Sequence, residues 1–222
     1  MFRFYLIRLQ RSEDYANRHL RSRWFGRRTM KLLHIDSSIL GEQSASRTLS
    51  REIVARWRAR VPALEVTYRD LAASALPHLS GPSLARADAE EAARNDATLD
   101  EFLAADVIVI GAPMYNFSIP SQLKAWIDRV VVAGKTFRYT AAGPEGLTSG
   151  KQVIVATTRG SIYAPGASGE FAEAYLKHVL GFIGVRNVEI VRAEGLGLSP
   201  QHREKGLQAA LATIAEPLAV AA

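Results

Sequence analysis

The sequence predicts an α/β fold in which helices cover both faces of a doubly wound, five-stranded parallel sheet. From Met30 onward, short apolar runs alternate with segments of helical spacing, which is the pattern of strand–helix–strand units. The run Val107 to Ile110 is apolar without interruption, as expected for a central strand that is covered on both sides. Polar segments follow three of the runs, at the edge where open parallel sheets bind ligands. The length of 222 residues suits one such domain.

The individual elements follow from their patterns in chain order. The predicted strands are residues 31–35, 65–71, 106–112, 151–157 and 188–193. The predicted helices are residues 46–61, 83–104, a segment from Pro120, residues 169–183 and a segment from Pro200, with Trp57 and Trp126 packed against the sheet. Residues 134–150 are polar and contain several glycines and a proline, which predicts a loop or hairpin. Five strands joined by crossovers favour the flavodoxin-like strand order over a closed barrel, which needs more strands.

The net charge of +6 is confined to the amino-terminal segment, residues 1–29. This segment holds eight arginines and two acidic residues, whereas residues 30–222 hold 20 basic and 20 acidic side chains. The balanced charge of residues 30–222 gives no reason to expect nucleic-acid binding by this domain. For the segment we expect either a disordered basic extension or upstream sequence added to a protein that starts at Met30. Its composition, rich in arginine and poor in acids, is also shared by organellar transit peptides.

Missing residues and motifs exclude several classes of function. Cysteine is absent, which rules out disulfides, thiolate catalysis and cysteine-ligated metals. The five histidines lack metal-ligand spacing, so no metal site is predicted, and His34 is expected to be a packed group within a strand. The sequence has no GxGxxG, Walker or GxSxG pattern, which disfavours a dinucleotide fold, a P-loop nucleotidase and a serine hydrolase. No apolar run approaches the roughly 20 residues that cross a bilayer, so we expect a soluble, cytoplasmic protein without membrane partners.

Three polar segments are expected to converge on one ligand site. We call them the first loop (residues 37–46), the second loop (residues 112–117) and the third loop (residues 158–161). They follow the first, third and fourth strands of the predicted sheet, which are neighbours at the topological switch point of the flavodoxin-like order. A ligand crevice is therefore expected where the three loops meet.

Each loop has a chemistry of its own. Ser44 and Ser46 in the first loop, together with the amides at the start of a helix, suit a phosphate, although helix capping uses the same geometry. Asn116 in the second loop suits the edge of a flat heteroaromatic ring and its neighbours suit the ring face, with core packing as the alternative. In the third loop Gly160 allows close backbone approach, and Arg159 is expected to face solvent.

From Met30 onward the chain resembles the FMN-dependent NADH azoreductases, also described as NAD(P)H-quinone reductases. The resemblance covers residues 30–222 and none of residues 1–29. Its most specific segments, in order, are PMYNF (113–117), GKTFRYT (134–140), GPEGL (143–147), GFIG (181–184) and AEG (193–195).

This resemblance implies a homodimer that binds FMN at the carboxyl edge of each sheet, with Trp126 and the apolar helix after Pro120 either at the dimer interface or in the core. The implied phosphate ligands are Ser38, Ser44, Ala45 and Ser46. The implied lining of the flavin ring is Met114, Tyr115, Asn116 and Phe117. The residues implied at the polar edge of the ring are Thr158, Arg159, Gly160 and Ser161. The family often has a second glycine at the position of Ser161, so a side chain is expected close to the flavin there. Phe137 and Tyr139 are implied to lie beside the substrate pocket.

The leading hypothesis is an FMN-dependent NAD(P)H oxidoreductase that reduces quinones and cleaves aromatic azo compounds. In the implied ping-pong sequence, NADH or NADPH delivers a hydride to the flavin, the first product leaves, and the acceptor takes two electrons in the same pocket. No side chain is predicted as a catalytic acid or base, because the flavin carries the chemistry. A non-enzymatic flavodoxin-type electron carrier is the main alternative, against which stand the neutral charge of residues 30–222 and the insertion at 134–150. A phosphodiester hydrolase would need a metal site or a nucleophile pair, and neither is found.

Overall fold

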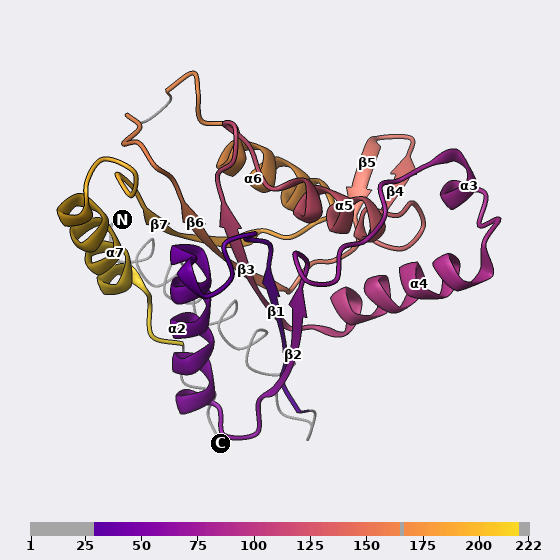
Figure 1. Ribbon diagram of the computed structural model, residues 1–222. Coiled ribbons are helices and arrows are strands. Elements are labelled where there is room, and N and C mark those ends of the chain that lie inside the picture. The colour runs from indigo at the N-terminus through magenta and orange to yellow at the C-terminus, as the bar shows by residue number, and fades with distance from the viewer. Residues whose placement is uncertain (1–28, 165–166, 218–222) are drawn as a thin grey trace, which may run out of the picture. The chain divides into compact units, whose positions relative to one another are not determined.

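The computed structural model describes residues 29–164 and 167–217 (Figure 1). The chain divides into two units, residues 1–30 and 31–222, and every helix and strand of the described residues belongs to the second unit. The expectations for the basic segment fall on residues 1–28 almost entirely, and these lie outside the described part of the chain. That residues 30–222 form one FMN-binding domain stays a prediction.

Five parallel strands form the central sheet, in the order β2-β1-β3-β6-β7. Their bounds are β1 (Lys31–Asp36), β2 (Glu65–Asp70), β3 (Val107–Pro113), β6 (Gln152–Thr158) and β7 (Asn187–Ala193). The chain reverses its winding direction between β1 and β3, which are hydrogen-bonded neighbours. The flavodoxin-like order and the doubly wound parallel sheet are thereby confirmed.

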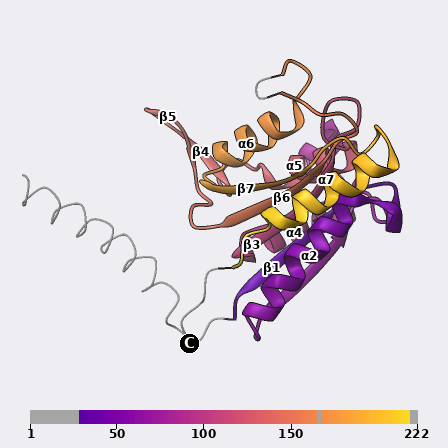
Figure 2. The ribbon, with the colours of Figure 1, turned by 90° about the vertical axis from the view of Figure 1, so that its left-hand side faces the viewer.

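Helices cover both faces of the sheet. The helices α2 (Ala45–Arg60) and α7 (Pro200–Thr213) lie against each other on one face, where α2 contacts β1, β3 and β6, and α7 contacts β7 (Figure 2). The helices α4 (Ala89–Ala104), α5 (Ser121–Val130) and α6 (Ala172–Phe182) contribute to the core on the other face. No helix in the described ranges is long and apolar enough to cross a membrane.

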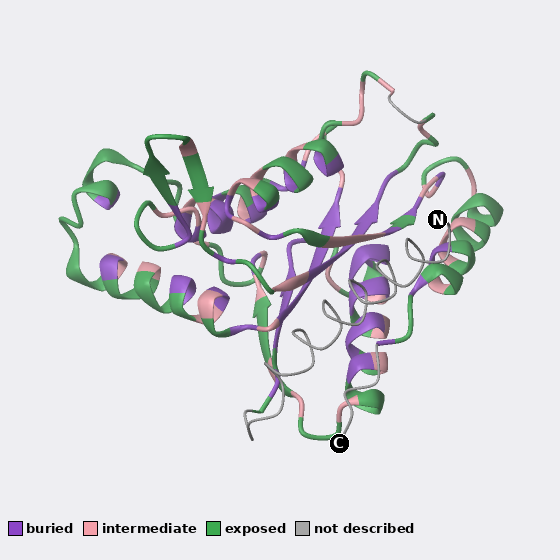
Figure 3. Ribbon diagram, turned by 180° about the vertical axis from the view of Figure 1, so that it is seen from behind, coloured by how far each residue is buried: buried purple, intermediate pink, exposed green. Residues whose placement is uncertain are grey.

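Burial explains why the strand sequences are apolar without alternation. Every residue of β3 is buried, as are most residues of the central strands (Figure 3). Alternate side chains of a parallel strand enter the cores on its two faces, and helices cover both faces here. Leu33, Ile108 and Val153 are in register on adjacent strands and share the core that contains Phe102 and Trp126. The rings of Phe102 and Trp126 meet edge to face at 5.9 Å, so Trp126 is a core residue, as expected from its helical position.

Two local differences from the sequence predictions have physical causes. The single helix predicted over residues 83–104 is interrupted, because α3 (Gly81–Leu84) ends before Arg86, which has a positive φ of 54°. A new helix then begins at the cap Asp88, whose carboxylate accepts the N–H groups of Glu90 and Glu91. Pro120 immediately precedes α5 rather than lying inside its first turn.

The segment at 134–150 is a hairpin, one of the two forms predicted from its sequence. Its strands are β4 (Phe137–Thr140) and β5 (Gly143–Gly146), which pair antiparallel as a separate two-stranded sheet. The hairpin packs on the end of α6, where a Cβ atom on Gly146 would lie 2.1 Å from the backbone nitrogen of Gly184. Only a glycine at position 146 permits this close approach of two backbones.

Candidate functional site

The three polar loops meet at the carboxyl ends of β1, β3 and β6, as predicted. The first and second loops are joined by a hydrogen bond between Ser38 Oγ and Tyr115 Oη at 3.1 Å. The second and third loops are joined where the Met114 N–H donates to the Thr158 carbonyl at 2.7 Å. The convergence follows from the strand order, because β3 lies between β1 and β6.

The first loop presents hydrogen-bond donors at the start of α2. Ser44 caps the helix, since its Oγ accepts the N–H of Arg47 at 3.3 Å, and it also pairs with Ser46 Oγ at 3.0 Å. The capping interpretation is therefore confirmed, and both serines are buried. The two hydroxyls share one hydrogen bond, so one hydroxyl hydrogen remains to be donated. Together with the positive end of the α2 dipole beside Ala45, this donor set fits an anion such as a phosphate.

A buried arginine, which no sequence motif indicated, binds the backbone of the first loop. Arg47 is 6% exposed and makes a bidentate ion pair with Asp70, at 2.6 Å from Nη1 and 2.8 Å from Nη2. Its Nη2 also donates to the Ser38 carbonyl at 2.9 Å. The Asp70 carboxylate in turn accepts the N–H groups of Ala72 and Ala73. Arg47 thereby ties the first loop to the end of β2.

Beside this pair, Asp36 is the centre of a buried polar network. Its carboxylate accepts from Ser50 Oγ at 2.8 Å and from Tyr68 Oη at 3.1 Å, and His34 Nε2 lies 3.5 Å away. Burial acts to raise the pKa of Asp36, but its interactions with His34, Ser50 and Tyr68 outweigh burial and hold this pKa below its ordinary value. Burial and the Asp36 charge raise the pKa of Tyr68 to about 12. His34 is a packed group, as expected.

The second loop turns tightly at Asn116 and Phe117. The N–H and carbonyl of Tyr115 pair with those of Ser118, and both central residues have positive φ, 48° for Asn116 and 70° for Phe117, as in a type I′ turn. Asparagine tolerates this conformation, but phenylalanine does so only under strain. The ring of Phe117 is also 57% exposed, so core packing does not explain it. A strained, exposed aromatic residue at a strand end indicates a ligand surface.

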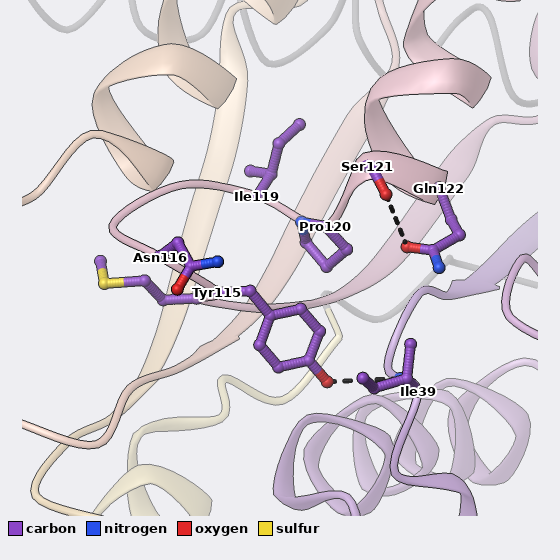
Figure 4. A pocket seen from close by; sticks show the side chains of 8 residues that line it. Ile39, Tyr115, Asn116, Ile119, Pro120, Ser121 and Gln122 are labelled. Atoms are coloured by element: carbon purple, nitrogen blue, oxygen red, sulfur yellow. Dashed lines mark hydrogen bonds between the residues drawn. The ribbon is translucent and has the colours of Figure 1, made fainter. Parts of the chain in front are cut away.

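An open cleft of about 610 Å³ lies against the second loop (Figure 4). It is lined by Ile39, Met114, Tyr115, Asn116, Ile119, Pro120, Ser121 and Gln122. The Tyr115 ring lies across it and its hydroxyl accepts the N–H of Ile39 at 3.3 Å. A mainly apolar cleft of this size with a few polar groups suits a small-molecule ligand. The lining includes three of the four residues predicted for a ring site, and Phe117 is outside it.

The expectation for Arg159 was wrong. Arg159 is 5% exposed and does not face solvent, because its guanidinium lies between Glu173 at 2.9 Å, Glu194 at 3.0 Å and Glu170 at 3.4 Å. Arg192 completes the cluster by pairing with both oxygens of Glu173. Burial acts to raise the pKa of Glu173, but the arginines and Lys177 lower it below its ordinary value. The backbone of Arg159 is engaged as well, since its N–H donates to the Ala193 carbonyl at 3.0 Å and its carbonyl accepts the Leu196 N–H at 3.2 Å.

The third loop directs a row of unpaired backbone amides away from β7. The carbonyls of Arg159, Gly160 and Ser161 accept from Leu196, Gly197 and Gly195, in the segment that follows β7. In a trans peptide the next N–H points opposite to the carbonyl. The N–H groups of Gly160, Ser161 and Ile162, which we call the amide row, therefore point away from residues 195–197, and they have no acceptor in residues 29–164 and 167–217.

Phe137 and Tyr139, predicted beside the substrate pocket, do not line the cleft of their own chain. Phe137 is buried and its ring packs on Phe182 at 4.7 Å, whereas Tyr139 is 75% exposed on the hairpin. Thr158 is buried at the end of β6, and Ser161 is exposed beside Gly160. A Cβ on Gly160 would meet only Gly197, at 3.8 Å, so the fold itself does not require glycine there.

The site depends on charged residues that motifs do not reveal. Asp36 and Asp70 end β1 and β2, and Glu194 follows β7, so each stands at the functional edge of the sheet. Their place at the ends of predicted strands could have been read from the sequence as a sign of function. The sequence does not show which of the charged side chains are buried together. In the part of the chain that the structure covers, no group of three or more metal-ligating side chains comes together.

A parallel sheet in this order, with donor-rich loops at its carboxyl edge, defines a flavodoxin-like class of protein, and comparison with known proteins agrees. A family model described as "Flavodoxin-like fold" matches residues 30–218. The FMN-dependent NADH:quinone oxidoreductase 1 of Pseudomonas putida is 55% identical over 203 residues, covering 87% of this chain and 100% of that protein.

Solved structures give the same answer. An azoreductase from Bacillus anthracis str. Sterne has a TM-score of 0.75 at 32% identity, over 83% of this chain and 96% of that one. An FMN-dependent NADH-azoreductase from Bacillus anthracis str. Ames Ancestor, solved in complex with FMN, has a TM-score of 0.76 at 26% identity, over 83% and 95%. The chain belongs to the flavodoxin-like family and, within it, to the FMN-dependent NADH:quinone oxidoreductases and azoreductases.

Proposed function

We propose that this chain is an FMN-dependent NAD(P)H oxidoreductase that reduces quinones and cleaves aromatic azo compounds. The observation that carries the proposal is the meeting of three chemically different loops at one edge of the sheet. A donor-rich helix start, a mainly apolar cleft that contains the Tyr115 ring, and a row of free amides match the phosphate, the ring face and the polar ring edge of FMN in turn.

The proposed cofactor contacts follow the three loops. Ser38, Ser44, Ala45 and Ser46 hold the phosphate, and Met114, Tyr115, Asn116 and Phe117 line the ring. Thr158, Arg159, Gly160 and Ser161 meet the polar edge, with the N–H groups of Gly160 and Ser161 as the donors, because both the backbone and the side chain of Arg159 are engaged elsewhere. Residues 30–222 form the FMN-binding domain in this proposal. Relatives named for NADH favour NADH as the donor, and a cytoplasmic location, where NADH is available, follows from it.

Bound FMN supplies the redox chemistry, taking a hydride equivalent from the nicotinamide and passing two electrons to the acceptor in alternation. For a quinone, one NADH and one proton give NAD⁺ and the hydroquinone. Cleaving an azo bond to two amines takes four electrons and therefore two such cycles. The chain's part is to bind and orient the two flat molecules in turn, and the open cleft beside Met114 and Tyr115 gives both the same entry.

We also propose that the enzyme works as a homodimer. Large apolar side chains at the functional edge are exposed, including Phe117, Ile162, Phe171 and Leu198, and a second copy would cover them. Since Tyr139 projects from the hairpin and does not line its own cleft, a dimer would make it available to the cleft of the partner chain. Light scattering on the purified protein tests the dimer directly, and a monomer at working concentration contradicts it.

The proposed function has a simple test. The purified protein should be yellow, bind FMN in a one-to-one ratio, and oxidise NADH rapidly when a small quinone or an azo dye is added. A protein that cannot be reconstituted with FMN contradicts the whole proposal. A protein that binds FMN but does not oxidise NADH would instead be an electron carrier of the flavodoxin type.

A further inference from the structure

We propose that Glu194 is a positioning residue that holds the amide row of Gly160, Ser161 and Ile162 toward the polar edge of the flavin ring. The inference rests on the proposed function, since it concerns how this chain would tune a bound FMN. In this role Glu194 changes the affinity of the protein for reduced FMN relative to oxidised FMN, and this effect is separate from any contribution of Glu194 to folding.

The first argument is that the amide row is available to a ligand. Its three N–H groups have no acceptor among the described residues, and the paired carbonyls direct them away from the segment that follows β7. On the opposite side of β6 lies β3, which leads into the second loop, where Met114 is bonded to Thr158. Oriented amide donors of this kind stabilise a negative charge, and they do so most effectively when they are held in place before the charge develops.

The second argument is that one carboxylate holds both ends of the row. Glu194 Oε1 makes an ion pair with Arg159 on the residue before the row, 3.0 Å from Nε but without the geometry of a hydrogen bond, and it accepts the Tyr163 N–H at 3.1 Å on the residue after the row. The Arg159 guanidinium also lies over the Tyr163 ring, 5.2 Å from its centroid. Residues 160–162 are thus closed into a short bracket whose two ends meet at Glu194.

The third argument is that the fold does not depend on this carboxylate. Without Glu194 the buried Arg159 keeps its ion pairs with Glu173 at 2.9 Å and Glu170 at 3.4 Å. The charge of the guanidinium therefore remains compensated, and the large penalty of an unpaired buried charge is avoided. What is lost is the acceptor for the Tyr163 N–H and the closure of the bracket.

The effect on FMN has a definite sign. Reduction of a flavin places negative charge on its N1–C2 carbonyl edge, so a well-positioned amide row favours the reduced over the oxidised cofactor. Loosening the row lowers the two-electron midpoint potential. Removing a carboxylate charge by itself acts in the opposite direction, because a negative charge nearby disfavours the reduced flavin. The loss of position lowers the midpoint potential and the loss of charge raises it, so the sign of the change distinguishes the two effects.

The test compares Glu194→Ala, Glu194→Gln and Glu170→Gln in the FMN-loaded protein. Glu194→Ala removes the acceptor, and we expect the ratio of affinities for reduced and oxidised FMN to fall about tenfold, which for two electrons is a potential about 30 mV lower. Glu194→Gln keeps an oxygen acceptor for Tyr163 and should hold the potential at or above the wild-type value. Glu170→Gln also removes one carboxylate charge near Arg159 but leaves the bracket intact, and should likewise not lower the potential.

The measurements are the midpoint potential, the Kd for oxidised FMN and the melting temperature without cofactor. An unchanged or raised potential in Glu194→Ala overturns the inference, as does an equal fall in Glu194→Gln. If Glu194→Ala unfolds, Glu194→Gln is compared with Tyr163→Pro, which removes the N–H that Glu194 accepts. A midpoint potential that is unchanged in Glu194→Gln and lowered in Tyr163→Pro supports the inference. Any other pattern contradicts it. A wild-type protein that binds no FMN refutes the proposed function and is recognised before any variant is measured.

Discussion

At the scale of single residues, Phe117 shows a conflict between folding and ligand binding. A phenylalanine at φ 70° costs roughly 1–2 kcal/mol relative to a relaxed backbone, and its ring gains little from burial because it is mostly exposed. The protein retains the residue at the end of β3, where the proposed ring site lies. Strain kept at such a position is typical of functional sites.

We therefore predict that Phe117→Gly stabilises the protein and weakens FMN binding. Glycine adopts positive φ freely, so the free energy of unfolding should rise by about 0.5–1 kcal/mol after the entropic cost of glycine is subtracted. Loss of the aromatic ring should raise the Kd for FMN by about fivefold or more. The control is Asn116→Gly, which relieves less strain because asparagine tolerates φ 48°. Chemical denaturation and fluorescence titration give both quantities, and a destabilised Phe117→Gly would contradict the strain argument.

Residue types at the strand ends were readable in the sequence, but their partners were not. Ser44 and Asn116 could be assigned to a cap and a turn because the signals are local. Arg159 was misjudged because lone arginines are usually solvated, and its three carboxylate partners come from two other segments, one at the start of α6 and one after β7. Arg47 and Asp70 are 23 residues apart and meet only because β2 pairs with β1.

At the scale of elements, the hairpin is placed by a contact between two glycines. Gly146 on β5 and Gly184 after α6 approach so closely that a Cβ at position 146 would overlap the backbone. Two further bonds, from Thr148 N–H at 3.0 Å and Thr148 Oγ1 at 2.7 Å to the Ile183 carbonyl, hold the strand end beside α6. The orientation of Tyr139 therefore depends on a contact made at the other end of the hairpin.

We predict that Gly146→Ala displaces the hairpin from α6. The substitution should lower the free energy of unfolding by about 1–3 kcal/mol, the usual cost of overpacking, and increase amide exchange in residues 137–148. Quinone turnover should fall in the dimer while FMN binding is retained, because the three cofactor loops are separate from this contact. Glu145→Gln is the neighbouring control, since it breaks only the exposed pair with Arg138 and should leave exchange unchanged. Equal exchange in the two variants would contradict the placement.

Helices and strands could be predicted where the apolar pattern extended over many residues. The predicted boundaries were wrong where a single residue determines the end of a helix. The five strands followed from apolar runs, and their order followed from the regular alternation of strands with crossovers, which favours the flavodoxin-like order over a barrel. The break between α3 and α4 depends on Arg86 in a left-handed conformation, for which an arginine gives no signal. The Gly146–Gly184 contact depends on tertiary packing and has no local pattern at all.

At the scale of the whole domain, its acidic groups are paired at the functional edge. Asp36 and Asp70 end neighbouring strands, and Glu173 begins α6, with each carboxylate held by arginines or hydroxyl donors. Burial acts to raise the pKa of each, but the pairing prevails, so the pKa values of Asp36, Asp70 and Glu173 all lie below their ordinary values. The same side chains shape the three loops, so stability and ligand binding share one set of charges.

From this pairing we predict a loss of stability in acid. Because the carboxylates have lower pKa values in the folded than in the unfolded chain, the unfolded chain binds more protons as the pH falls below about 5. The stabilisation is complete above the ordinary values and is lost as the pH falls through the lowered ones. Denaturant titrations at pH 7, 5 and 4 should show this decline, and Asp70→Asn should be less stable at pH 7 but show a shallower decline, since its charge no longer contributes. The control is Asp100→Asn, an exposed carboxylate on α4 without an ion pair in the described residues, which should keep the wild-type slope. If Asp70→Asn and the wild type lose stability in parallel, the Arg47–Asp70 pair is not a source of the pH dependence.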